Sequence, residues 1–162
     1  MDWEQRLAEL WAAIDSLGED EFLARMDNLT AELPANSAIA LFERAAAQDS
    51  TGHSDRAVPL YRQALAQGLT GIRRRRAVIQ MASSLRNLGN ASESVALLEA
   101  EREQGSDELD DAVSGFLALA LADLGREREG LALALRALAP HLPRYQRSLA
   151  NYARLLVEPD DE

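Results

Sequence analysis

Polar and charged side chains gather in the stretch from Arg73 to Gly89, which reads RRRRAVIQMASSLRNLG. Forked guanidinium donors beside amides and a hydroxyl suit the recognition of peptide carboxylates and main-chain groups. Five of these side chains recur at spacings of three and four, which places them on one face of a helix. We expect this face to bind a peptide or protein segment through Arg76, Gln80, Ser83, Arg86 and Asn87.

The opposite wall of such a groove would come from the preceding helix, through Phe42, Glu43 and Asp49. Phe42 would supply apolar contact to a bound segment. The two acids have a second interpretation, which we favour. Polar groups at the contact between neighbouring helices usually satisfy one another, so Glu43 and Asp49 would pair with Arg76 and Arg86.

The run of four arginines from Arg73 to Arg76 begins a predicted helix, where the backbone amides already carry positive charge. One interpretation is a site for an anion or an acidic peptide. The other, which we favour, is pairing with acids on adjacent elements, such as Glu99, Glu103 or Asp107. We expect no bare-anion site here if these pairs form.

Catalytic chemistry has little support in the sequence. His53 and His141 lie far apart, and neither has a partner at metal-ligand spacing. Ser83 and Ser84 lack the glycine pattern of a nucleophile elbow, and the chain has no cysteine. We therefore predict a protein that is not an enzyme and has no cofactor or metal; a hydrolase is a remote alternative.

Composition favours helix throughout. The chain has 162 residues, of which 47% are hydrophobic and only 5% aromatic, and it is rich in Ala and Leu. Its net charge of −10 opposes binding to nucleic acid or to an anionic membrane. The start is acidic and no apolar run has the length of a membrane span. We expect one all-α, cytoplasmic domain.

A short apolar pattern recurs four times and ends each time at a glycine. The spacings are 52 − 18 = 34, 89 − 52 = 37 and 125 − 89 = 36, which is typical of stacked helical hairpins. Each glycine is expected to end a helix in the left-handed conformation. The predicted domain, 1–156, has about nine helices and precedes an acidic tail, 157–162. Its helices are expected at 3–17, 19–33, 37–51, 54–68, 71–88, 91–104, 107–124, 127–139 and 143–156, so that the hairpins span 3–33, 37–68, 71–104 and 107–139.

This pattern resembles the tetratricopeptide repeat, through Gly52, Ala57, Tyr61 and Ala64 in the second hairpin. The strings LFERAAAQDSTG, LYRQAL, RRRRAVIQMASSLRNLG and FLALALADLGRERE are similar to the bacterial group-5 tetratricopeptide proteins. The resemblance implies an α-solenoid, a tetratricopeptide-like superhelix, without enzymatic activity. It also implies that the first helix of each hairpin lines a concave groove, with helix 71–88 as its floor.

The fourth hairpin has small or apolar residues, Gly115, Phe116 and Leu119, at positions that should face the groove. An uncovered patch of this kind marks an interface. We favour cover by the terminal helix of the same chain, through Tyr145, Leu149, Tyr152, Leu155 and Leu156. Cover by a second subunit is the alternative. A monomer is therefore expected, with a homodimer as the alternative.

These observations predict a non-catalytic module for protein–protein interaction, which binds its partner in the groove lined by helix 71–88. The alternative is a self-associating scaffold that uses the apolar fourth hairpin. The sequence does not identify the partner, because helical repeats are reused for many partners.

Overall fold

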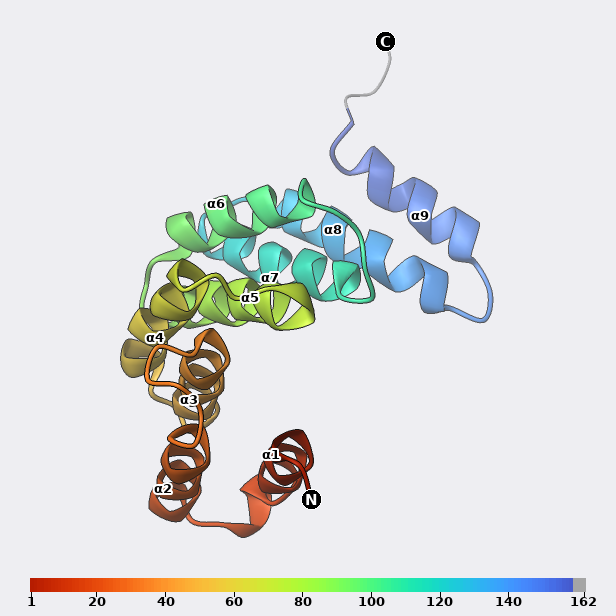
Figure 1. Ribbon diagram of the computed structural model, residues 1–162. Helices are drawn as coiled ribbons and strands as arrows, with labels where there is room; N and C mark the ends of the chain where they lie inside the picture. The colour runs from red at the N-terminus through yellow and green to blue at the C-terminus, as the bar shows by residue number, and fades with distance from the viewer. Residues whose placement is uncertain (159–162) are drawn as a thin grey trace. The chain divides into compact units, whose positions relative to one another are not determined.

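The computed structural model describes residues 1–158, so most of the predicted acidic tail lies outside the described residues. In this part of the chain the secondary structure is entirely helical, with nine α-helices and two short 3₁₀ helices (Figure 1). The all-α prediction is confirmed. The α-helices are α1 (Trp3–Ala12), α2 (Glu19–Thr30), α3 (Ala38–Ser50), α4 (Ser54–Ala66), α5 (Gly71–Asn87), α6 (Ala91–Arg102), α7 (Asp110–Asp123), α8 (Glu127–Leu138) and α9 (Gln146–Leu155). The 3₁₀ helices are η1 (Ile14–Ser16) and η2 (Ala139–His141).

The first helix is shorter than the sequence pattern predicts. α1 ends at Ala12, and the amide of Ala13 is shared between the carbonyls of Glu9 and Leu10. This sharing tightens the chain into η1, as often happens at helix ends. The remaining helices begin and end close to the predicted positions.

Three of the four predicted glycine turns have the same geometry. Gly52, Gly89 and Gly125 have φ angles of 89°, 84° and 75°, which disfavour a side chain. In each turn the next residue donates its amide to the carbonyl four residues before the glycine, at 2.8, 2.8 and 2.9 Å. This bond closes a helix end of the Schellman type. Gly18 departs from the prediction, because it is the extended N-cap of α2, with φ −68°.

The chain divides into two compact units, Met1–Ser84 and Leu85–Glu162. The expectation of one domain over 1–156 stays a prediction. In the N-terminal unit α1 packs on α2, α2 on α3 and α3 on α4. Trp11 meets Phe22 edge-on, with ring centroids 5.3 Å apart. Phe42 lies against Tyr61 at 6.2 Å, and these aromatic pairs join the apolar rows of the helices.

In the C-terminal unit α6 packs on α7, α7 on α8 and α8 on α9. Val113, Leu117 and Leu121 of α7 are buried in its core. The backbones of α7 and α8 approach closely at Gly130, where an added Cβ would lie 2.6 Å from the carbonyl oxygen of Ala118. This glycine allows the two helices to pack at short range.

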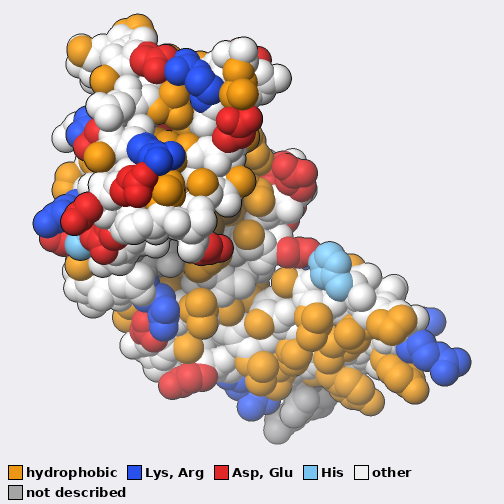
Figure 2. Space-filling view, turned by 90° about the horizontal axis from the view of Figure 1, so that it is seen from below, with side chains coloured by type: hydrophobic (Ala, Val, Ile, Leu, Met, Phe, Trp, Pro, Cys, Tyr) orange, Lys and Arg blue, Asp and Glu red, His pale blue; other side chains and the backbone are white. Residues whose placement is uncertain are grey.

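The terminal helix packs on the fourth hairpin through α8, so the predicted cover of Phe116 and Leu119 on helix 107–124 is wrong. α9 packs on α8 and η2, and it buries only Ala153. Phe116 and Leu119 of α7 stay 36% and 47% exposed. Figure 2 shows hydrophobic side chains gathered on its right-hand part, which belongs to the C-terminal unit. Part of the apolar surface of that unit is therefore exposed.

The apolar row of α5 is buried at Val78, Met81, Ala82 and Leu85. Leu88, which comes next on the same spacing, is 44% exposed. The reason is that α5 ends at Asn87, so Leu88 leaves the helical row. No helix within residues 1–158 combines the length and the apolar character needed to cross a bilayer.

Candidate functional site

Arg76 of α5 is held in place by an aromatic ring. Its Cζ lies 5.1 Å from the centroid of the Phe42 ring, at the distance of a cation–π contact. The side chain is half-buried, and within residues 1–158 it has no carboxylate partner. The ring of Phe42 therefore fixes the position of the guanidinium.

A polar cluster connects α5 to α3 and α4. The Tyr61 hydroxyl lies 3.2 Å from Gln80 Oε1 and 3.3 Å from Asp49 Oδ2. Ser84 donates to Asp49 Oδ1 at 2.7 Å. Burial raises the pKa of the Asp49 carboxyl and also that of the Tyr61 phenol. The hydrogen bonds of Asp49 and Tyr61 connect α3 and α4 to α5, and the contact of Tyr61 with Oε1 fixes the side chain of Gln80.

Two predicted groove residues lie in the interior. Phe42 is fully buried, and Glu43 is 1% exposed. Glu43 accepts hydrogen bonds from Trp11 Nε1 and from Arg73 Nε, both at 3.0 Å. The predicted pairing of Glu43 with Arg76 is therefore wrong. The predicted apolar contact from Phe42 to a bound segment is also wrong. The Phe42 ring is buried against Tyr61 of α4 and contacts Arg76.

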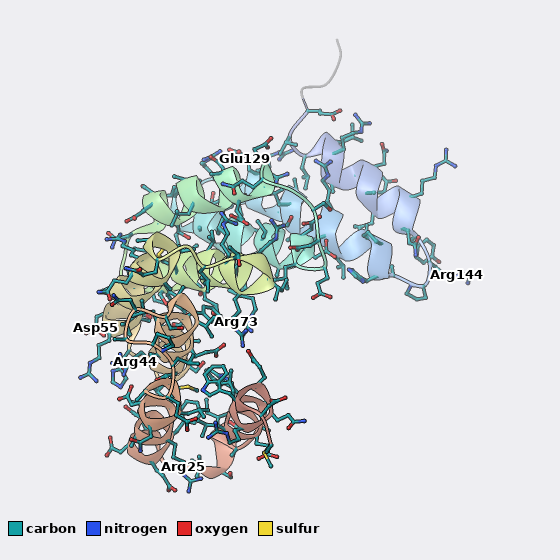
Figure 3. The ribbon with its side chains drawn as sticks, viewed as in Figure 1. Arg25, Arg44, Asp55, Arg73, Glu129 and Arg144 are labelled. Atoms are coloured by element: carbon teal, nitrogen blue, oxygen red, sulfur yellow. The ribbon has the colours of Figure 1, made fainter. Side chains whose placement is uncertain are left out.

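The arginine run begins with an internal ion pair. Arg73 reaches Glu4 of α1 through Nη2 at 2.6 Å, in addition to its bond to Glu43 (Figure 3). The hydrogen bond to Glu4 is the main cause that raises the pKa of Arg73. Arg74 and Arg75 have partners as well. Internal pairing is confirmed for Arg73, although its partners are not the acids that the sequence suggested.

The last two candidates on α5 belong to the C-terminal unit. Arg86 forms a two-point contact with Asp123, through Nε at 2.6 Å and Nη2 at 3.2 Å. The predicted pairing of Arg86 with Asp49 is therefore wrong, because its carboxylate partner is Asp123, which accepts a hydrogen bond from Nη2. Asn87 is exposed at the end of α5, and Ser83 of the N-terminal unit is partly exposed. Arg76, Gln80 and Ser83 remain as the best-defined part of the predicted face.

Sequence reasoning missed Arg73, Ser84 and Asp123 as the residues that arrange this region. Their partners lie 69, 35 and 37 positions away along the chain. For Ser84 and Asp123 the sequence does carry a signal. Their partners lie about one repeat period away, which is the separation between equivalent positions of neighbouring hairpins. The bond from Arg73 to Glu4 spans two periods.

No group of three or more His, Cys, Asp or Glu side chains within the described residues is arranged to hold a metal ion. His53 pairs with Glu19 at 2.5 Å, and Ser84 donates to Asp49. The serine–histidine pair that a hydrolase needs is therefore not formed by these two residues.

Comparison with known families agrees with this architecture. The model of the Tetratrico peptide repeat family, group 5, matches residues 38–156, from the first residue of α3 to just beyond α9. The chain belongs to this tetratricopeptide repeat family. Proteins of the family are generally non-catalytic modules for protein interaction. No curated protein and no solved structure gave a significant match to the chain.

Proposed function

We propose that the protein is a non-catalytic interaction module, which binds a peptide or protein segment on the face of α5 that carries Arg76, Gln80 and Ser83. The observation that carries this proposal is the state of Arg76. Its guanidinium is half-buried and stacked on Phe42, and no carboxylate within residues 1–158 neutralises it. A pre-oriented cation of this kind loses little side-chain entropy when an acceptor binds.

The neighbouring groups define what this face can recognise. Gln80 uses its oxygen on Tyr61, which leaves the amide nitrogen to donate to a main-chain carbonyl. Ser83 adds a hydroxyl one turn further along α5. Together with Arg76, these donors fit the carbonyls and an acidic side chain of an extended segment.

Peptides selected from a random library on the full chain provide the test. We expect Arg76→Ala to weaken the selected peptide about tenfold or more, since a charge-assisted hydrogen bond contributes about 1.5–3 kcal/mol. The matched control is Arg56→Ala, which removes the same charge from an exposed position on α4. Fluorescence anisotropy gives both affinities. Equal binding by the parent and by Arg76→Ala would remove this face as the site.

A second candidate function is self-association through the fourth hairpin. The exposure of Phe116 and Leu119, which α9 leaves uncovered, favours it. Light scattering over a range of concentrations should then show a dimer that becomes a monomer in a Phe116→Ser, Leu119→Ser double variant. A strict monomer at every concentration removes this candidate and leaves the α5 proposal intact.

A further inference from the structure

The C-terminal unit has a hollow of about 640 Å³, which we call the C-terminal hollow. It lies between α6, α8 and the residues that follow α9. Its accessible apolar lining comes from Leu133 of α8 and from Leu156 and Val157 just after α9, whereas Leu117 and Leu121 of α7 also border it but are buried in the core. The volume is within the range of roughly 300–1,000 Å³ that ligand sites occupy. No residue of α5 lines it, so it is separate from the face proposed above.

Internal contacts hold part of the lining in place. Arg128 Nε donates to the carbonyl of Leu156 at 2.5 Å, which ties the end of α9 to α8. Arg126 donates to both oxygens of Glu129, at 2.9 and 2.7 Å, and lies 3.7 Å from Glu99. Arg126 is therefore neutralised by Glu129 within the unit. Arg128 keeps its charge, and its Nε is used by the carbonyl of Leu156.

Two further arginines of the lining have no carboxylate partner among residues 1–158. Arg102 lies at the end of α6 and Arg136 in the last turn of α8. Within the described part of the chain, neither makes an ion pair or a side-chain hydrogen bond. Glu127 also lines the hollow, but it lies in the first turn of α8, nine residues and about 13 Å along that helix from Arg136.

We propose that the C-terminal hollow is a second binding site, which takes a peptide segment with acidic side chains next to apolar ones. Its carboxylates would meet the guanidinium groups of Arg102 and Arg136, and its apolar side chains would cover the leucine lining. The lining calls for both acidic and apolar side chains in the ligand. An inorganic anion would leave the leucines of the lining uncovered. An apolar peptide would leave the two arginines without a counter-charge.

The probe for this site is a short fluorescein-labelled peptide of alternating Leu and Asp, titrated with the full chain. We expect saturable binding that weakens about tenfold when Asn replaces Asp, and again when Ser replaces Leu. The double variant Arg102→Ser, Arg136→Ser should also lose about tenfold in affinity. The matched control is Arg144→Ser, Arg147→Ser, which removes the same charge from two exposed positions: Arg144 lies just before α9 (Figure 3), and Arg147 lies in its first turn.

The control double variant should bind within about twofold of the parent, as should Arg76→Ala. Equal weakening by both double variants would overturn the proposal, because it would indicate general attraction between charges. Binding only after truncation beyond Glu158 would overturn it too, since the acidic tail of the chain itself would then be the occupant. The Asn and Ser peptides need no protein variant, so their result stands even if a variant fails to fold.

Discussion

The guanidinium of Arg76 lies over the ring of Phe42, with its Cζ 5.1 Å from the ring centroid. Phe42 is fully buried and also packs against Tyr61 of α4, so the ring is fixed by the core of the N-terminal unit. Phe42 therefore acts on a bound segment through Arg76. A core residue sets the position of the cation that we assign to binding.

Phe42→Leu should weaken the library-selected peptide several-fold, although Phe42 cannot touch that peptide. The substitution removes the aromatic face, and with it a cation–π contact of about 0.5–2 kcal/mol. Phe22→Leu is the matched control, because Phe22 is equally buried in the same unit and packs against Trp11. Both variants should lose stability in urea, but only Phe42→Leu should lose affinity. Equal affinity loss in the two variants would contradict this role.

Glu43→Ala should destabilise the fold more than the loss of an exposed acid. It leaves the Trp11 N–H without its acceptor and Arg73 with Glu4 alone. We expect a loss of about 2–3 kcal/mol in the free energy of unfolding, measured by urea denaturation. Glu21→Ala removes a surface pair with Arg25 and should cost no more than about 0.5 kcal/mol. Similar losses of unfolding free energy in both variants would show that the buried Glu43 contributes no more to stability than an exposed acid.

Asp49 should give the stability a distinctive pH dependence. Burial raises the pKa of its carboxyl in the folded state, so the folded protein holds the proton more tightly than the unfolded chain. The contribution of Asp49 to the free energy of unfolding therefore increases as pH falls from neutral through the raised pKa. It levels off below about 3.9, the ordinary value for Asp.

Asp49→Asn removes this titration and keeps an oxygen that can accept from Ser84. Urea denaturation of parent and variant at a series of pH values should show the parent gaining stability relative to the variant on acidification. Effects of the other carboxyls cancel in this difference. A difference that is flat, or that slopes the other way, would contradict the assignment.

Two glycines of the C-terminal unit should respond to alanine with opposite signs. At Gly130 the new Cβ would lie 2.6 Å from the backbone oxygen of Ala118, so α7 and α8 must separate. We expect a loss of about 1–3 kcal/mol in unfolding free energy. Gly115 lies inside α7 with open space around its Cβ, and Gly115→Ala should add about 0.5–1 kcal/mol. Chemical denaturation measures both, and a stable Gly130→Ala would mean that the helices can move apart at little cost.

The helical hairpins could be predicted from sequence because their signals are local. Gly52, Gly89 and Gly125 each follow an apolar row and end a helix through the same backbone bond. The direction of a polar or aromatic side chain was harder to predict. Phe42 shares its face with Ala45 and Ala46, and only the packing of α4 against that face shows that it is buried.

The partners of charged residues and of the terminal helix could not be predicted, because they depend on distant parts of the chain. Arg73 reaches Glu4, which is 69 residues away. α7 and α8 both offer apolar side chains, such as Leu119 and Leu131, so periodicity alone does not say which of them α9 covers. The packing of α9 on α8 leaves Phe116 exposed.

Site-specific photo-crosslinking tests the central proposal, binding on the α5 face, most directly. A benzophenone amino acid is placed at Ser83, next to Gln80 on that face, or at Arg56 on α4 as the control. With the library-selected peptide, we predict a strong covalent adduct from position 83, which fades when Arg76 is also replaced by Ala, and little adduct from position 56. Equal adducts from both positions, or an adduct only from position 56, would contradict the assignment of this face as the binding site.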